Sequence, residues 1–214
     1  YMDERLRAAE ALLDRFEALA AGAGVRSFER RLIDDETGAA LALATRYADL
    51  AVLGQPDPDR PAPPGAAGLP ASTLFDGAHP VLVVPYIQAD AAVGRRILVA
   101  WNGSTQAARA VSAALPLLRS ADAVVVAIAG SPAQPAQPDD ELLAWLARHD
   151  VDAELAAETT TLDAGNCLLS LAADRGSDLL VMGGYGHARL RELLLGGATR
   201  TVLQAMTIPV LMAH

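Results

Sequence analysis

The chain has 214 residues, with 17 basic and 26 acidic side chains and a formal net charge of −9. This acidic balance excludes the broad positive surface on which nucleic-acid binding depends. No apolar run reaches the ~20 residues that a helix needs to cross a bilayer, and the charged start does not resemble a secretory signal. A single cysteine, Cys167, excludes an internal disulfide and a metal site of several cysteines. We therefore expect a soluble, cytoplasmic α/β protein that binds neither nucleic acid nor a membrane.

Residues 1–89 alternate helical and strand-like segments. We expect a helix from about Asp3 to Ala21, a strand over 25–32, a helix over 35–48 and strands over 49–54 and 79–85. The stretch QPDPDRPAPPG between the last two strands is rich in proline and aspartate, which is typical of a loop.

From residue 95 onward, apolar runs of strand length alternate with segments of helical periodicity. The strands are expected over 95–102, 122–130, 151–160, 178–183 and 208–214, and the helices over 105–121, 141–150, 161–177 and 189–206. Wholly apolar strands are typical of a parallel sheet that is covered on both faces. Five strands separated by four helices predict a right-handed, doubly wound parallel sheet with helices on both faces.

Two sequence matches at one spacing indicate an internal duplication. The segment DLAVLG at 49–54 resembles DLLVMG at 178–183, and PVL at 80–82 recurs at 209–211, so that both matches lie 129 residues apart. We expect a complete domain over residues 93–214 and a partial, degenerate copy over residues 1–89. The partial copy lacks a counterpart of the opening strand, helix and strand, so we expect at least ~35 further residues before Tyr1.

Two groups of glycines follow the fourth strand of the complete copy. The sequence GGYG at 183–186 is separated by nine residues from GGAT at 196–199. Glycine lets the backbone turn tightly and approach a ligand, and the first amides of a helix attract an anion. The two groups are therefore candidates for a phosphate cradle at the carboxyl edge of the sheet. The alternative is that the glycines only end a strand and let a helix pack closely.

The pattern strand, G-x-x-G, nine residues, G-(S/T) resembles the nucleotide signature of the universal stress proteins, with Gly183, Gly186 and Gly196 in register. The segments ILVAWNGS, LLLGGATRTVL and IPVLMAH are similar to that family too. The resemblance covers residues 95–214 fully and residues 1–86 as a truncated copy. It implies a flavodoxin-like, adenine-nucleotide alpha-hydrolase-like fold in tandem, and the binding of ATP or a related adenine nucleotide, with or without Mg²⁺. Some members of the family bind no nucleotide.

The resemblance also assigns binding residues. Asn102 ends the first strand where ATP-binding members carry an aspartate, and the backbone of Ile128 stands where such members contact adenine. Gly197 replaces the usual serine or threonine, so a hydroxyl near the terminal phosphates is lost while the backbone N–H remains. The predicted nucleotide-binding residues are Asn102, Ile128, Gly183, Gly186, His187, Gly196, Gly197, Ala198 and Thr199. We predict no catalytic and no metal-binding residue.

Neighbouring side chains admit two interpretations. Arg189, Arg191 and Arg200 flank the predicted cradle and either reach phosphate oxygens or form a solvated helix face. Trp101 either walls the site or belongs to the core. The first copy is expected to be structural, because Asp57 stands among prolines where the second glycine of the signature would be. The signatures of dehydrogenases, P-loop proteins and α/β-hydrolases are absent from the sequence.

Two functions from different classes follow from these patterns. The first is a stress-response regulator or signalling module that binds an adenine nucleotide in its C-terminal domain. The alternative is a scaffold protein of the same family that binds no nucleotide and acts through dimer-like assembly. A slow ATPase is a third function, for which no residue is placed as a base.

Each copy ends in an apolar strand that carries no charge, over 81–84 and 210–213. The fifth strand of such a sheet lies at an edge, where unpaired backbone groups invite another strand. Single-domain members of the family dimerise through this strand, so the resemblance indicates the same contact. We therefore predict that Val81–Val84 pairs antiparallel with Val210–Ala213 within one chain, about a pseudo-twofold axis. A homodimer is the alternative use of these edges.

Overall fold

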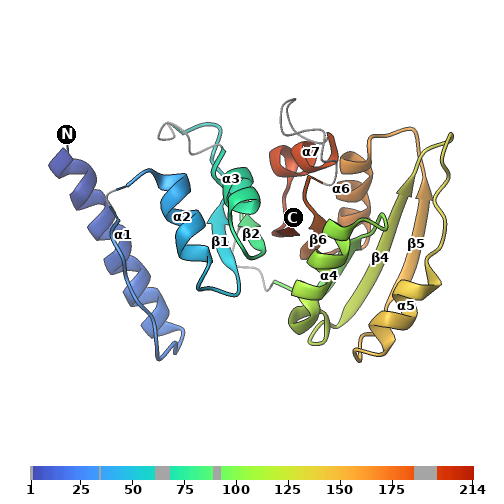
Figure 1. The fold of residues 1–214 in the computed structure, drawn as a ribbon, viewed down its shortest axis with the longest axis horizontal. Helices are drawn as coiled ribbons and strands as arrows, with labels where there is room; N and C mark the ends of the chain where they lie inside the picture. The colour runs from blue at the N-terminus through green and yellow to red at the C-terminus, as the bar shows by residue number, and fades with distance from the viewer. Residues whose placement is uncertain (1, 34, 61–67, 89–92, 186–196) are drawn as a thin grey trace. The chain divides into compact units, whose positions relative to one another are not determined.

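The computed structural model describes residues 2–33, 35–60, 68–88, 93–185 and 197–214 (Figure 1). These residues form seven helices and seven strands, and they fall into two compact units, residues 1–40 and residues 41–214. The helices are α1 (Met2–Gly22), α2 (Thr37–Thr45), α3 (Leu69–Asp76), α4 (Thr105–Leu118), α5 (Asp140–Ala147), α6 (Ala164–Asp174) and α7 (Gly197–Ala205). The strands are β1 (Ala51–Gly54), β2 (Val81–Val84), β3 (Arg96–Ala100), β4 (Ala123–Gly130), β5 (Glu154–Thr159), β6 (Leu179–Gly183) and β7 (Val210–Ala213).

In the N-terminal unit, the segment that follows α1 packs back along this helix. Phe28 meets Phe16 of α1 edge to face, with ring centroids 5.7 Å apart. The Arg30 guanidinium donates a hydrogen bond to the Asp14 carboxylate at 2.7 Å. An aromatic pair and an ion pair therefore hold the segment against the helix.

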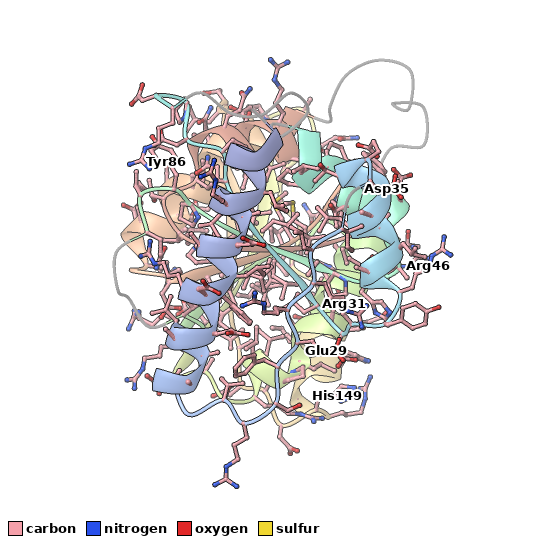
Figure 2. The ribbon with its side chains drawn as sticks, turned by 90° about the vertical axis from the view of Figure 1, so that its left-hand side faces the viewer. Glu29, Arg31, Asp35, Arg46, Tyr86 and His149 are labelled. Atoms are coloured by element: carbon pink, nitrogen blue, oxygen red, sulfur yellow. The ribbon has the colours of Figure 1, made fainter. Side chains whose placement is uncertain are left out.

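The prediction of a strand over residues 25–32 is wrong. Phe28 and Arg30 face α1, while the intervening Glu29 and Arg31 form an exposed ion pair at 2.7 Å (Figure 2). This alternation has the period of a strand, but it arises from an extended chain lying on a helix. A strand needs a hydrogen-bonded neighbour, and the segment has none among the residues that the structure describes.

Strands β3 to β7 form the parallel sheet that the sequence predicts. Their order is β7-β6-β3-β4-β5, and all neighbouring pairs among these five are parallel. The chain starts in the middle with β3, winds to one side with β4 and β5, and crosses to the other side with β6 and β7. The prediction of a doubly wound α/β fold is confirmed.

Alternate residues of the central strands face two separate helical layers. Ile97 and Val99 of β3 belong to a core with α4 and α5, whereas Leu98 belongs to a core with α3, α6 and α7. All three side chains are at most 1% exposed. Burial on both faces explains why these strands have continuous apolar sequences.

The two copies join through their last strands into one sheet of seven strands. β2 pairs antiparallel with β7, with Leu82 opposite Leu211 at the centre, Val81 opposite Met212 and Val83 opposite Val210. The two outer pairs are equivalent under the 129-residue repeat, so a pseudo-twofold axis passes through the central pair. The predicted intramolecular pairing of these strands is confirmed.

The strand register also agrees with the internal repeat. Ala51 lies opposite Val81 in β1 and β2, and Leu180 lies opposite Val210 in β6 and β7, which is the same register 129 residues later. The sequence pattern does not predict α3, which stands at the repeat position of α7. Within the described residues the first copy contributes two strands to the sheet, where three were expected. The division into domains 1–89 and 93–214 stays a prediction.

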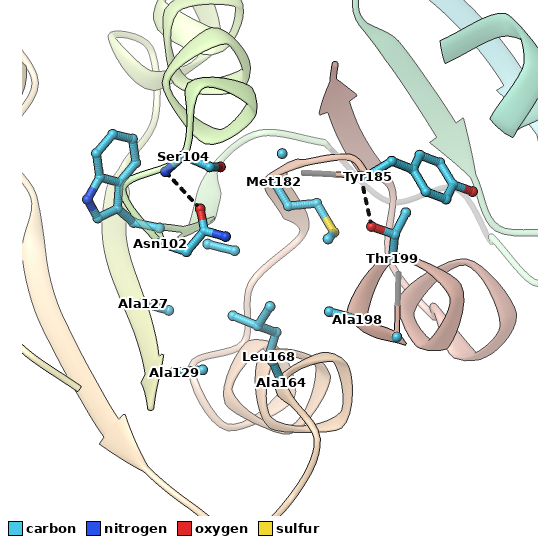
Figure 3. A pocket seen from close by; sticks show the side chains of 14 residues that line it. Asn102, Ser104, Ala127, Ala129, Ala164, Leu168, Met182, Tyr185, Ala198 and Thr199 are labelled. Atoms are coloured by element: carbon cyan, nitrogen blue, oxygen red, sulfur yellow. Dashed lines mark hydrogen bonds between the residues drawn. The ribbon is translucent and has the colours of Figure 1, made fainter. Parts of the chain in front are cut away.

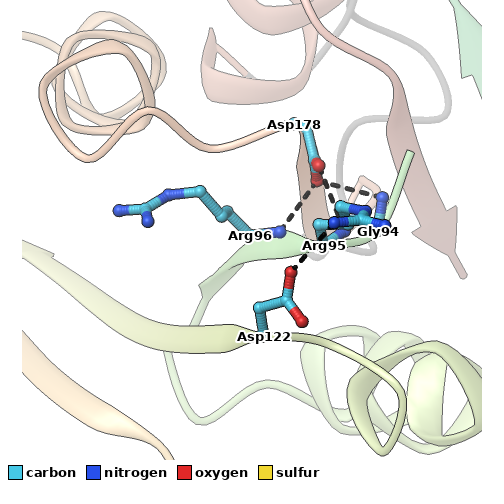
Figure 4. Close-up of polar contacts among 5 residues, drawn as sticks. All are labelled: Gly94, Arg95, Arg96, Asp122 and Asp178. Carbon is cyan, nitrogen blue, oxygen red and sulfur yellow. Dashed lines mark hydrogen bonds and ion pairs between the residues drawn. The ribbon is translucent and has the colours of Figure 1, made fainter. Parts of the chain in front are cut away.

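At the amino end of the sheet, one carboxylate holds the starts of β3 and β6 together (Figure 4). The Asp178 Oδ1 atom accepts hydrogen bonds from the N–H groups of Gly94 and Arg96, at 2.9 and 3.0 Å. Its Oδ2 atom accepts from the N–H of Arg95 at 3.1 Å. The repeat equivalent, Asp49, is exposed and has no hydrogen-bond partner within the described part of the chain. Three backbone donors thus depend on Asp178 and none on Asp49.

We expect Val83→Lys to destabilise the fold by about 3–5 kcal/mol, because it places an unpaired charge in the closed joint between β2 and β7. Val83 is fully buried, whereas Val52 on the outer strand β1 is 60% exposed. Val52→Lys is therefore the matched control and should change stability by less than about 0.5 kcal/mol. Urea unfolding followed by circular dichroism measures both variants, and equal midpoints would contradict the buried joint.

Asp178→Ala should lower the free energy of unfolding by about 1–3 kcal/mol, because backbone donors at the start of β3 lose their acceptor. Asp49→Ala removes the same side chain at the equivalent position of the repeat and should leave stability nearly unchanged. Thermal unfolding of the two variants and the wild type gives the comparison. A similar loss in both variants would show that general surface charge, rather than these hydrogen bonds, is responsible.

Candidate functional site

A cavity of about 280 Å³ lies at the carboxyl edge of the sheet, beside the ends of β3, β4 and β6 and the starts of α6 and α7 (Figure 3). Here the winding of the chain switches from one side of β3 to the other, which is where open α/β sheets bind ligands. The lining residues are Ala100, Trp101, Asn102, Ser104, Ala127, Ala129, Ala164, Leu168, Met182, Gly183, Tyr185, Gly197, Ala198 and Thr199.

Small side chains leave the space open, and larger apolar ones bound it. Leu168 of α6 and Met182 of β6 reach into it from two sides (Figure 3). Trp101 is fixed at the end of β3 because its indole N–H donates to Asp139 Oδ2 at 2.7 Å. Asp139 in turn caps α5 by accepting from the N–H of Leu142. The described lining contains no charged side chain, so the cavity is apolar with a few hydroxyl and amide groups.

The turn after β3 places Asn102 beside the cavity. Its Oδ1 atom accepts a hydrogen bond from the N–H of Ser104 at 3.1 Å. Ser104 then caps α4, because its Oγ atom accepts from the N–H of Ala107 at 3.1 Å. Asn102 therefore has one structural bond already, and its amide N–H groups stay available for a ligand.

The opposite side of the cavity joins the end of β6 to the start of α7. The N–H of Tyr185 donates to Thr199 Oγ1 at 3.3 Å, and both side chains are almost fully buried. Gly197 begins α7, and a Cβ atom built there would have no neighbour within 4 Å among the described residues. The first turn of α7 is thus anchored by Thr199 and open at Gly197.

The structure brings together most of the predicted residues that it describes. Asn102, Gly183, Gly197, Ala198 and Thr199 all line the one cavity. Gly186, His187 and Gly196 lie outside the described residues. Their part in the site stays a prediction.

Ile128 does not line the cavity, although its neighbours Ala127 and Ala129 do. Successive residues of a strand face opposite sides of the sheet, and the Ile128 side chain packs against the core with α4 and α5. The predicted contact of the Ile128 backbone with adenine stays a prediction. The sequence reasoning missed four lining residues, Leu168, Met182, Ser104 and Tyr185. The sequence did carry a signal for the strand residues, because side chains in β4 and β6 point alternately to the two faces of the sheet.

Gly183 has a packing role that is independent of any ligand. A Cβ atom at this position would lie 2.5 Å from the backbone N of Ala107 and 2.8 Å from the carbonyl carbon of Gln106, in the first turn of α4. Only glycine therefore lets α4 approach the end of β6 this closely. These contacts support the alternative interpretation of Gly183, in which the glycine lets a helix pack closely against the strand.

Arg200 does not line this cavity. It is exposed and lines a second cavity of about 450 Å³, together with Pro56, Gly68, Tyr86 and others. Arg189 and Arg191 lie outside the described residues. The position of Arg200 therefore does not support the predicted contact between this side chain and a phosphate.

Cys167 is buried in α6, and burial raises the pKa of its thiol. A protonated thiol in an apolar setting is a packing group and not a nucleophile. Within the described ranges, no group of three or more His, Cys, Asp and Glu side chains could hold a metal ion. Among the same residues, no helix is both long and apolar enough to span a membrane.

The complete copy matches one family of known proteins. The model of the universal stress protein family matches residues 94–214. The chain belongs to the universal stress protein family. A universal stress protein of Synechocystis is 38% identical over 58 residues, and one of Methanocaldococcus jannaschii is 39% identical over 44 residues. These stretches cover 27% and 21% of this chain, and the chain spans 20% and 27% of the length of these two relatives.

The fold is also that of a solved universal stress protein. The crystal structure of such a protein from Archaeoglobus fulgidus matches 100% of this chain and 80% of its own, with a TM-score of 0.73 and 16% identity. The likeness extends over the whole chain and confirms the predicted α/β fold.

Gly183→Ala should destabilise the protein by about 1–3 kcal/mol, because the added methyl group collides with the backbone of α4. The matched control is Gly54→Ala, at the equivalent position of the first copy, where an added Cβ meets nothing within 4 Å. That control should be unchanged or slightly more stable. Chemical unfolding of both variants without ligand measures the difference, and equal stability would contradict the packing role of Gly183.

Proposed function

We propose that the protein binds an adenine nucleotide in this cavity and acts as a cytoplasmic stress-response regulator. One observation carries the proposal: residues that the sequence signature assigns to a nucleotide site, from three separate segments, line a single cavity at the switch point of the sheet. These residues are Asn102, Gly183, Gly197, Ala198 and Thr199.

The cavity suits the adenosine part of a nucleotide. Its volume lies near the lower end of ordinary ligand pockets, which start at about 300 Å³. Trp101, Leu168 and Met182 offer apolar surfaces to a base. The amide group of Asn102 offers donors to the polar edge of the base or to the ribose.

The start of α7 is the side toward which we place the phosphates. The first N–H groups of a helix have no partners inside the helix and lie at the positive end of its dipole. Gly197, Ala198 and Thr199 begin α7 beside the cavity. The described lining has no carboxylate, so Mg²⁺ bound with ATP would be held by the phosphates and by water.

We assign the protein a regulatory role because the described site offers no base. Hydrolysis of ATP needs a group that orients or activates water. Tyr185 is the one titratable side chain in the described lining, and burial raises the pKa of its hydroxyl above the usual value. It is therefore protonated at neutral pH. Binding without turnover suits a protein that reports which nucleotide is present.

A scaffold that binds no nucleotide is the second candidate, favoured by the lack of charge in the described lining. Mass spectrometry of the denatured, purified protein, followed by calorimetric titration with ATP and AMP, separates the two functions. We expect carried-over nucleotide, or binding with a dissociation constant below about 1 mM. No carried-over nucleotide and no heat of binding at millimolar ATP or AMP would favour the scaffold.

Gly197→Ser should tighten ATP binding relative to AMP, because it restores a hydroxyl where the family usually has one. A Cβ atom at Gly197 would contact none of the described residues, so the substitution needs no displacement of them. Gly197→Ala adds the Cβ atom without the hydroxyl and is the matched control. We expect a gain of about ten- to a hundredfold for ATP in the serine variant alone, because one hydrogen bond to a charged group contributes about 1.5–3 kcal/mol. Equal affinities in all three proteins, measured by calorimetry, would place the phosphates elsewhere.

A further inference from the structure

In the described residues, helix α3 of the first copy packs against the end of β6, beside the site of the second copy. We propose that α3 positions the phosphate side of the nucleotide site, with Phe75 as the positioning residue. The inference rests on the proposed function for its ligand. The packing of α3 against Tyr185 does not depend on a ligand and is tested in the protein without nucleotide.

The backbone that needs positioning is at Tyr185, directly after β6. Its φ of 54° lies in the left-handed region, which an aromatic residue rarely adopts and which persists only when the surroundings hold it. Its N–H donates to Thr199 Oγ1, and both residues line the cavity. Tyr185 therefore ties the end of β6 to the first turn of α7, the turn that we assign to the phosphates.

Helix α3 supplies the surface against which Tyr185 is held. The Tyr185 ring, only 5% exposed, packs on Phe75 with centroids 4.4 Å apart and planes inclined by 34°. Phe75 also meets the ring of His214 edge to face at 4.8 Å, and His214 Nδ1 lies 3.1 Å from the carbonyl oxygen of Gly184. Leu74 fills the space beside Gly184, so that a side chain there would collide with its Cδ2 atom. The strained backbone is thus enclosed by α3 and the C-terminal residue.

Across the pseudo-twofold axis, the contact of Leu74 with Gly184 has an equivalent in the hydrogen bond from Gln55 to Leu203, whereas the aromatic packing has none among the described residues. The repeat equivalents of Phe75, Tyr185 and Gly184 are Gln204, Pro56 and Gln55. Those three equivalents line the open cavity of about 450 Å³. A contact that served only to join the copies would be expected on both sides of the axis. Among the described residues, the aromatic cluster is found at the end of β6 and not at the equivalent end of β1, and its member Tyr185 lines the nucleotide cavity as well as the second cavity. Because only the second copy has this cluster, we assign it to the nucleotide site.

Phe75→Ala tests the ligand part of the inference. We expect ATP affinity to fall about two- to tenfold, the range of one aromatic pair, while the affinity for adenosine stays the same because it has no phosphates. Phe75→Tyr keeps the ring and should restore ATP binding. Gln204→Ala, at the equivalent position of the repeat, is the control that should change neither affinity. Calorimetry with ATP and adenosine measures all four proteins.

Two results would overturn the positioning role in that experiment. One is unchanged ATP binding in Phe75→Ala, and the other is an equal loss for ATP and adenosine, which a general loss of structure would produce. If Phe75→Ala does not fold, Phe75→Leu replaces it, since leucine keeps apolar volume without the ring.

Hydrogen exchange of the nucleotide-free protein separates this inference from the proposed function. Phe75→Ala should speed amide exchange several-fold in peptides that contain residues 183–185 and 197–199, but not in β3 or β4. Unchanged exchange in the first two peptides, or equal acceleration everywhere, overturns the inference. If the wild type binds neither ATP nor adenosine, the proposed function fails, while the exchange data still decide whether Phe75 holds Tyr185.

Discussion

The antiparallel hydrogen bonds between β2 and β7 are the constraint on which the rest of this molecule depends. Both strands are apolar along their whole length, and an open edge of this kind pairs readily with other chains. Their pairing closes both edges and fixes the register between the copies. That register brings Gln55 of the first copy to α7, where its side chain donates to the carbonyl oxygen of Leu203 at 2.8 Å. It also brings α3 to the end of β6, so the geometry of the site follows from the joint.

The sequence predicts those elements whose pattern reflects their own burial. Strands β3, β4 and β6 are apolar because helices cover both faces of the sheet. Each of these strands can therefore be recognised from its own sequence alone. The segment 25–32 has the alternation of a strand, but alternation does not tell whether the neighbour is a strand or, as here, a helix. Helix α3 is short and follows a proline-rich stretch, and its helical state depends on Leu74 and Phe75 packing against the second copy. Such dependence on distant residues has no local signature.

The candidate site was predictable where it follows the glycine signature and unpredictable where it depends on packing. The signature located Gly183 and Gly197, but it could not separate their roles. The close approach of α4 explains Gly183, while none of the described residues packs where a side chain at Gly197 would lie. The Ile128 side chain faces the layer opposite to the cavity, because adjacent strand residues alternate between faces, and the predicted contact of its backbone with adenine stays a prediction. Tyr185 could not be found, since its left-handed backbone is held by a helix from the other copy.

The pairing of β2 with β7 also determines how long β2 must wait for its partner strand during synthesis. Val83 pairs with Val210, roughly 130 positions later, whereas Ala51 pairs with Val81 only about 30 positions away. At about 5–20 residues per second, a ribosome needs roughly 6–25 s to deliver β7 after β2 has emerged. The apolar edge of β2 therefore stays unpaired by β7 throughout this interval, which exposes the nascent chain to pairing with other chains.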